Sequence, residues 1–231
     1  MHSKFVAVLA LAFGLGVAQA ASAADMPMKA PMKAPPLPAP IVYNWTGFYI
    51  GINGGGGWGR TSHTDTTGTT SGNFNQSGGL VGGTVGYNWQ ITSWVLGVEA
   101  DWDWAHIDGS VFLPGLCVGA NCFTNLESFG TARARLGYAW DRWLVYATGG
   151  AAWGHISAGQ DSCVPGTLCG TKDQLGWTIG GGVEAFVIPK WSVKFEYLYA
   201  DLGSPVLYTP AIPVNVTEKV NIVRAGVSYH F

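Results

Sequence analysis

Apolar and polar side chains alternate with a period of two in one segment of this chain after another. The clearest window is WVLGVEADWDWA, residues 94–105, in which every even position is Trp, Leu, Val or Ala, while the odd positions include Glu99, Asp101 and Asp103. Successive side chains on a β-strand point to opposite faces, whereas a helix would mix the two sets. The window therefore predicts a strand with one apolar, aromatic face and one acidic face.

The same alternation predicts seven further strands. It is strong in four more windows, which are residues 126–140, 174–187, 191–200 and 221–231. It is weaker in three others, which are residues 45–59, 78–89 and 143–155. Residues 143–155 are apolar at both odd and even positions, so the pattern leaves the orientation of that strand open. In residues 126–140, Glu127 shares the predicted polar face with Arg133 and Arg135.

The connections between these windows alternate between short and long. Short links occur near residues 90–93, 141–142 and 188–190, and long polar or glycine-rich links occur near 60–77, 106–124, 156–173 and 201–219. Short turns at one rim and long loops at the other are typical of outer-membrane barrels, which also carry aromatic residues at both membrane interfaces. The predicted fold is all-β: an eight-stranded antiparallel up-and-down transmembrane β-barrel.

The interior of an eight-stranded barrel decides which face meets lipid. A soluble barrel of the lipocalin type would point its apolar side chains inward, but eight strands enclose room only for side chains or one small ligand. The aromatic faces of this chain would overfill that space, so we expect them to face hydrocarbon and the polar faces to line the lumen. The polar faces carry both charge signs, and paired charges are tolerated in a narrow interior far better than lone ones. The predicted lumen charge cluster, which we interpret as structural, consists of Glu99, Asp101, Asp103, Arg133, Arg135, Glu184, Lys194, Glu196 and Arg224.

One glycine motif suggests nucleotide binding, but the residues around it do not fit that interpretation. GINGGGGWG, residues 51–59, contains the G-x-G-x-x-G spacing of dinucleotide-binding loops. Such a loop must open a helix, but a flexible polar segment without helical periodicity follows Gly59. The near balance of 12 basic and 14 acidic residues likewise offers no electrostatic basis for binding nucleic acid. We predict no cofactor and no nucleic-acid partner.

The N-terminal region divides into an export signal and a proline-rich segment. Lys4, an apolar run and small residues ending at Ala23 predict a signal peptide over residues 1–23, with cleavage after Ala20 as the alternative. Residues 24–42, rich in Pro, Ala, Met and Lys, are expected to form an extended periplasmic tail or linker. The barrel domain is then assigned to residues 43–231.

The four cysteines fall in two close pairs within loop-like sequence. Cys117 and Cys122 form one pair, and Cys163 and Cys169 form the other. Short local disulfides are the natural interpretation in an oxidising compartment, although cross-pairing between the loops stays open. Neither pair has the C-x₂-C spacing typical of zinc sites, so we predict no metal.

Several stretches resemble the alphaproteobacterial outer-membrane immunogenic proteins, within the OmpA-like β-barrel superfamily. They are WTGFYIGINGGGGWG, VGYNWQ, ARLGYAWDRWLVYATGGAAWG, GWTIGGGVEAFV and VRAGVSYHF, and the resemblance covers about residues 42–231. It implies an integral barrel of the Gram-negative outer membrane with surface-exposed loops. Val227, Tyr229 and Phe231 resemble the C-terminal signal that the barrel-assembly machinery reads.

The leading functional prediction is a structural, surface-exposed envelope protein without catalysis. Its expected partners are outer-membrane lipid, lipopolysaccharide and, during biogenesis, the barrel-assembly machinery; a monomer is expected, and an oligomer stays open. One alternative is a small porin or solute channel, because charged lumens can select ions. A second is ligand capture by the loops, since His63, His106 and His155 lie in or near long connections and histidine binds haem iron and other metals.

Overall fold

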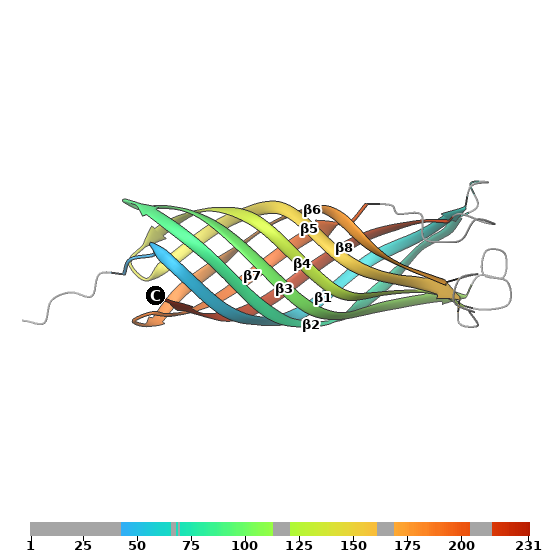
Figure 1. Ribbon diagram of the computed structural model, residues 1–231, viewed down its shortest axis with the longest axis horizontal. Coiled ribbons are helices and arrows are strands. Elements are labelled where there is room, and N and C mark those ends of the chain that lie inside the picture. The colour runs from blue at the N-terminus through green and yellow to red at the C-terminus, as the bar shows by residue number, and fades with distance from the viewer. Residues whose placement is uncertain (1–42, 66–67, 69, 113–120, 161–168, 204–213) are drawn as a thin grey trace, which may run out of the picture. The chain divides into compact units, whose positions relative to one another are not determined.

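The chain forms a closed barrel of eight antiparallel strands (Figure 1). The computed structural model describes residues 43–231 except 66–67, 69, 113–120, 161–168 and 204–213. Each strand pairs with its neighbours in sequence, and the first pairs with the last to close the ring. The strands are β1 (Gly47–Asp65), β2 (Thr70–Ile91), β3 (Trp94–Phe112), β4 (Asn121–Trp140), β5 (Trp143–Gln160), β6 (Cys169–Ile188), β7 (Trp191–Asp201) and β8 (Val214–His230). The predicted fold class is confirmed.

The two faces of each strand point where the alternation predicts. On β3, Trp102 is 47% exposed while its neighbour Asp101 is 4% exposed, and on β7, Phe195 is 55% exposed while Lys194 is 1% exposed. Apolar side chains therefore cover the outside of the barrel, and the charged ones fill its interior. The described residues include no helix that is long and apolar enough to cross a membrane.

The outward apolar side chains form a band. On β1 the band extends from Phe48 to Trp58, and Arg60 is the next outward residue. This length agrees with the roughly 9–11 residues that a tilted strand needs to cross the hydrocarbon core. Most of the strands continue beyond the band at one end, where their outward residues are polar. The strands therefore extend into segments that the sequence suggested were long loops. Residues 60–65 and 70–77, for example, are strand.

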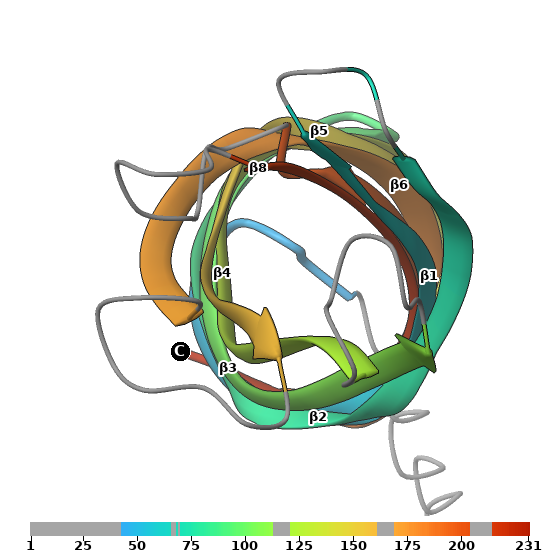
Figure 2. The ribbon, with the colours of Figure 1, turned by 90° about the vertical axis from the view of Figure 1, so that its right-hand side faces the viewer.

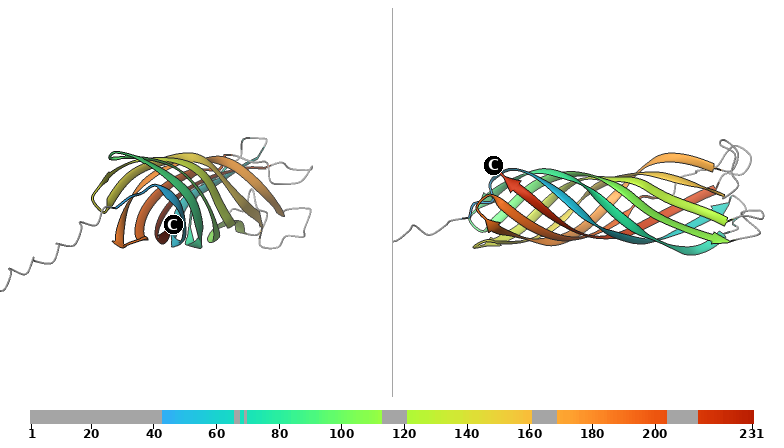
Figure 3. Two further views of the ribbon diagram at one scale, coloured as in Figure 1. Left: turned by 60° about the vertical axis from the view of Figure 1, so that its left-hand side comes forward. Right: turned by 90° about the horizontal axis from the view of Figure 1, so that it is seen from below.

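The two rims differ as expected for an outer-membrane barrel. Three tight turns, β2–β3, β4–β5 and β6–β7, lie at the rim that also holds both described chain ends (Figures 1 and 3). Each contains one non-glycine residue with positive φ: Thr92, Asp141 and Lys190. Such left-handed conformations fit the twist of two-residue hairpins. Short turns face the periplasm in outer-membrane barrels. We therefore call this rim the periplasmic rim and the opposite one the exterior rim.

One local departure from the alternation lies in β4. The pairing with β5 shifts between Leu126 and Ser128, which leaves Glu127 as an extra residue in a β-bulge. Glu127 is exposed, and its Oε1 accepts a 2.7 Å hydrogen bond from Ser157 Oγ. The prediction that Glu127 shares the inward face with Arg133 and Arg135 is therefore wrong, because a bulge reverses the phase of the alternation.

Candidate functional site

The lumen of the barrel is the candidate site, and its side chains form three layers. A buried apolar layer lies toward the exterior rim and includes Ile107, Phe129 and Ile222. The charged side chains occupy the middle, and an aromatic layer that includes Trp45 and Phe186 closes the periplasmic end. The middle layer contains all nine residues of the predicted lumen charge cluster.

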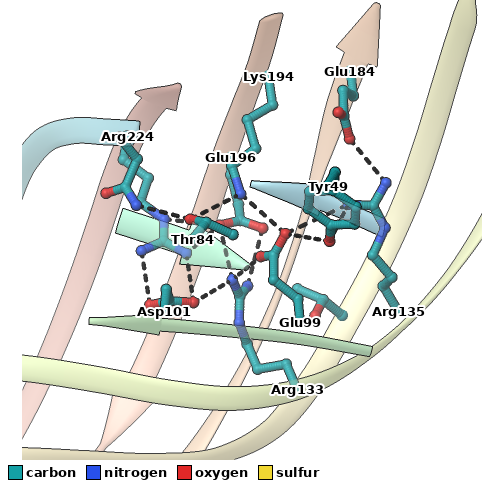
Figure 4. Close-up of polar contacts among 12 residues, drawn as sticks. Tyr49, Thr84, Glu99, Asp101, Arg133, Arg135, Glu184, Lys194, Glu196 and Arg224 are labelled. Carbon is teal, nitrogen blue, oxygen red and sulfur yellow. Dashed lines mark hydrogen bonds and ion pairs between the residues drawn. The ribbon is translucent and has the colours of Figure 1, made fainter. Parts of the chain in front are cut away.

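Arg133, on β4, lies at the centre of this cluster (Figure 4). Its Nη2 contacts Glu99 Oε1 closely and lies 2.9 Å from Asp101 Oδ2. Its Nη1 lies 3.0 Å from Glu196 Oε1, and its Nε donates a 2.8 Å hydrogen bond to Thr131 Oγ1. One guanidinium therefore joins carboxylates from β3 and β7, which are not neighbouring strands.

Arg224, on β8, joins much the same carboxylates from the other side. Its Nη1 lies 3.0 Å from Asp101 Oδ1 and 2.7 Å from Asp103 Oδ2. Its Nη2 lies 2.8 Å from Glu196 Oε2, and its Nε donates to the same oxygen at 2.9 Å. Arg133 and Arg224 thus share Asp101 and Glu196 between them, and the ion pairs cross the lumen from wall to wall.

The remaining two cations bind carboxylates nearer the periplasmic end. Arg135 Nη2 lies 2.8 Å from Glu184 Oε2, and Lys194 Nζ lies 3.0 Å from Glu99 Oε2. The guanidinium carbon of Arg135 also lies 5.3 Å from the ring centroid of Tyr49 and 4.5 Å from that of Tyr146. Both distances fall within the usual range of cation–π contacts.

The charges in the cluster nearly balance. Glu99, Asp101, Asp103, Glu184 and Glu196 face three arginines and one lysine, and His230 Nε2 lies 3.3 Å from Glu184 Oε1. All these side chains are almost completely buried. Removing one partner of a buried ion pair leaves a charge without compensation, which typically costs about 3–5 kcal/mol. The cluster thus links strands on opposite sides of the barrel.

Two tyrosines complete the cluster, and the sequence reasoning did not single them out. Tyr49 Oη donates a 2.7 Å hydrogen bond to Glu99 Oε2, and Tyr146 Oη donates a 3.0 Å bond to Glu196 Oε1. The signal for Tyr49 was its odd position among outward even residues on β1. Tyr146 gave no comparable signal, because its strand is apolar on both faces.

Two glycines permit close approach, Gly86 to the ring of Tyr49 and Gly55 to the backbone of β8. A Cβ at Gly86 would overlap the phenol of Tyr49, and a Cβ at Gly55 would lie 2.6 Å from Arg224 Cα. Glycine permits such close approach because it lacks a side chain. This is a structural use for Gly55, which belongs to the glycine-rich stretch over residues 51–59.

The residues before β1 enter the periplasmic end of the lumen. Trp45 is fully buried, its backbone N–H donates a 2.8 Å hydrogen bond to Gln90 Oε1, and its ring centroid lies 4.3 Å from that of Phe186. Tyr43 stacks on the same phenylalanine at 5.4 Å. Viewed along the barrel, this segment crosses the lumen (blue in Figure 2). The sequence placed Trp45 at the start of a strand. In the structure, β1 begins at Gly47, and the side chain of Trp45 fills the periplasmic end of the lumen.

A smaller polar group lies nearer the exterior rim. Glu218 is fully buried; its Oε2 accepts a 2.6 Å hydrogen bond from Thr61 Oγ1, and its Oε1 accepts a short bond from Gln76 Nε2. These neutral donors satisfy the carboxyl group, in contrast to the arginines around Asp101. Glu218 was not part of the predicted cluster.

The predicted loop features are only partly covered by the structure. Cys117 and Cys163 lie outside the described residues, as do the side chains of Cys122, Cys169 and His63. His106 Nε2 lies 3.8 Å from Asp108, and His155 Nδ1 lies 2.7 Å from Asp173, both on the outer wall of the barrel. Within the described part of the chain, no group of three or more His, Cys, Asp and Glu side chains is arranged to hold a metal ion.

Comparison with known proteins agrees with this architecture. Residues 7–231 match the family model described as the outer membrane protein beta-barrel domain. The chain belongs to this family. Over 100% of both chains, this outer-membrane barrel is 37% identical to the 31 kDa outer-membrane immunogenic protein of Brucella melitensis. It is also 34% identical to the 22 kDa outer membrane protein of Rhizobium leguminosarum, covering 81% of this chain and 79% of that one.

A solved structure with a similar outline is the outer membrane protein OprG of Pseudomonas aeruginosa. The likeness has a TM-score of 0.49 at 15% sequence identity and covers 81% of this chain and 98% of that one. The family and the full-length relatives place this barrel in the outer membrane of a Gram-negative bacterium. The resemblance to the immunogenic proteins is confirmed.

Proposed function

We propose that this outer-membrane barrel is a sealed structural component of the cell envelope that displays its long connections at the cell surface and performs no catalysis. The observation that carries the proposal is the filled lumen. Arg133 and Arg224 connect carboxylates across the full width of the barrel, and neither side chain is more than 1% exposed. Trp45 and its aromatic neighbours form a second barrier at the periplasmic end.

Sealing and stability have the same physical basis in this proposal. The ion pairs hold β3, β4, β6, β7 and β8 together through the interior, in addition to the hydrogen bonds between neighbouring strands. Side chains that are held by two or three charged partners do not move aside readily for a hydrated ion. A small channel, the alternative function, would need a continuous water-filled path past this layer.

Planar-bilayer recording on the refolded protein tests this proposal. We expect no discrete openings above the bare-bilayer background, because an ion would have to displace both the paired charged side chains and the buried Trp45 layer. Heat-dependent mobility on a detergent gel shows beforehand that the sample is folded. Reproducible unitary openings from such a sample would overturn the sealed barrel and favour the channel.

We infer several further features of this outer-membrane barrel from its sequence and its family. Val227 and Phe231 are exposed and Tyr229 is half-buried between them near the periplasmic rim, which supports a role as the signal for the barrel-assembly machinery. Membrane lipid and lipopolysaccharide are the proposed partners of the apolar band, and a monomer is the proposed state. Residues 1–23 and 24–42, outside the described residues, remain proposed as signal peptide and periplasmic tail. Cys117, Cys122, Cys163 and Cys169 remain proposed as disulfide-bonded, within each close pair or across the two pairs.

A further inference from the structure

Two cations stand side by side on the outer wall of the barrel. Arg60 on β1 and Lys219 on β8 are register partners, and both side chains are exposed. Among the ion pairs of the described residues, this pair takes part in one, in which Asp201 Oδ2 lies 3.8 Å from Lys219 Nζ. Because Asp201 lies beside Lys219 only, the pair keeps a net positive charge.

This arrangement is specific to one place on the described wall. Of the other described lysines and arginines, Arg133, Arg135, Lys194 and Arg224 lie in the lumen, and Arg142 and Lys190 lie in the periplasmic turns. Lys172 is on β6, two strands away from β8. Among the described residues, only Arg60 and Lys219 pair two outward cations in the half of the barrel near the exterior.

The height of the pair in the membrane is set by the apolar band. Trp58, the last apolar outward residue on β1, is 49% exposed and lies two residues before Arg60. On β8 the last is Val223, and the outward residues beyond it are Asn221 and Lys219. The pair therefore lies directly outside the hydrocarbon zone, on the exterior side, where the phosphates of outer-leaflet lipids are found.

A hollow beside the pair has an amphipathic lining, which suits a lipid with a charged head group and an apolar chain. Its volume is about 520 Å³, and Trp58, Arg60, Tyr199, Lys219 and Asn221 are among its lining residues. Asn221 is held in place, because its Oδ1 accepts a 2.6 Å hydrogen bond from Tyr197 Oη and its Nδ2 donates to Trp58 O at 3.4 Å. Aromatic rings thus lie on the membrane side of the hollow and cations on the water side.

We propose that Arg60 and Lys219 bind a phosphate group of a phosphorylated glycolipid of the outer leaflet, with the adjoining acyl chain against Trp58 and Tyr199. A guanidinium can hold two phosphate oxygens at once, and an ammonium adds a point charge. The inference rests on the proposed function only for the orientation of the barrel in the outer membrane. The proposed function names lipopolysaccharide as a partner, and this inference adds the place on the barrel where that lipid binds.

A lipid A titration followed by native mass spectrometry tests the site. The refolded full-length protein in detergent is compared with Arg60→Gln/Lys219→Gln and with the matched control Arg142→Gln/Lys190→Gln, which removes the same charge at the opposite rim. Each cation near an anionic lipid surface contributes about a factor of five, so we expect the first double variant to weaken retention of lipid A about twenty-five-fold. The control variant should bind as the parent does, and lipid A stripped of its phosphates should bind the parent weakly.

The outcomes against the proposal are equally distinct. Equal weakening in both double variants would show a general charge effect, and unchanged binding in Arg60→Gln/Lys219→Gln would remove the site. Complete displacement of lipid A by millimolar inorganic phosphate would show a free-phosphate site instead. Gel mobility and bilayer recording on the same samples separate these results from failure of the sealed barrel. A folded, silent barrel that does not discriminate lipid A would refute the site alone.

Discussion

Glu99 and Arg133 face each other across β3 and β4 as register partners, and their side chains meet in a close ion pair inside the barrel. Each also has a partner on β7: Glu99 accepts from Lys194 Nζ at 3.0 Å, and Arg133 Nη1 lies 3.0 Å from Glu196 Oε1. A contact between neighbouring strands is thereby extended across the lumen. The stability of this barrel should consequently depend on its interior charges in addition to the hydrogen bonds of its wall.

Loss of Arg133 should destabilise the barrel strongly. In Arg133→Met, Glu99, Asp101 and Glu196 lose a shared cation while they stay buried, and a buried charge left without its partner typically costs about 3–5 kcal/mol. Urea unfolding in lipid vesicles, followed by tryptophan fluorescence, measures the change. Arg142→Met removes an arginine that is about half exposed in a periplasmic turn and should change the free energy of unfolding by less than about 1 kcal/mol. Equal effects of the two substitutions would contradict the structural role of the cluster.

Removing Glu99 as well should restore part of the loss. In a double-mutant cycle, Glu99→Gln and Arg133→Met should be non-additive by roughly 0.5–3 kcal/mol, as for contacting residues in one network. Glu99→Gln combined with Arg142→Met should be additive, because these two residues share no partner. The free energies come from the same unfolding curves, and additivity in the first pair would show that the two side chains do not interact.

Gly86 should tolerate no side chain. Gly86→Ala would push against the Tyr49 ring, which cannot move freely because its hydroxyl is bonded to Glu99 and lies 3.1 Å from Arg135 Nη1. Overpacking of this kind typically costs about 1–3 kcal/mol. Gly83→Ala lies on the same strand but faces outward, with its nearest contact at 3.7 Å, and should be nearly neutral. The prediction is wrong if the midpoint of heat-dependent gel mobility falls equally for both variants.

Trp45 should stabilise the barrel from inside its periplasmic end. Trp45→Ala removes a fully buried ring that packs on Phe186 and His230, and such truncations typically cost about 3–5 kcal/mol. Trp89→Ala removes a ring on the outer wall that is already about half exposed, so its effect on the free energy of unfolding should be much smaller. Thermal unfolding in vesicles compares the two. Bilayer recordings of Trp45→Ala should stay silent, because the charged layer still closes the lumen.

Strand alternation was enough to predict eight strands and which face of most of them meets lipid, and the alternating lengths of their connections predicted the antiparallel order. It could not orient residues 143–155, because both faces of that segment are apolar and only its pairing with β4 and β6 decides that Tyr146 points inward. It missed the bulge at Glu127, since a single extra residue leaves the local composition unchanged. It also counted Trp45 as strand, because an aromatic stopper and an interfacial tryptophan look alike in one dimension.

The nine charged residues were predicted for a simple reason: ionic side chains on the inward face of a narrow barrel must meet each other. The partners that complete their bonding were harder to predict. Tyr49 contacts Glu99 over a separation of 50 residues, and the space that it needs comes from Gly86 on the neighbouring strand. Such contacts depend on the register of the closed ring, which the sequence pattern does not specify.

The most direct test of a sealed lumen with an apolar exterior is thiol labelling of single cysteines in vesicles, in a background in which the four native cysteines are serine. Trp102→Cys and Phe195→Cys place a thiol on the outer wall, and Thr84→Cys and Ser192→Cys place a small thiol in the lumen. We predict that the outer pair reacts with a lipid-soluble maleimide and that the inner pair reacts with neither that reagent nor a small water-soluble methanethiosulfonate while the barrel is folded. The account would be contradicted if Thr84→Cys and Ser192→Cys reacted rapidly with the water-soluble reagent. It would also be contradicted if Trp102→Cys and Phe195→Cys reacted with the water-soluble reagent and not with the lipid-soluble one.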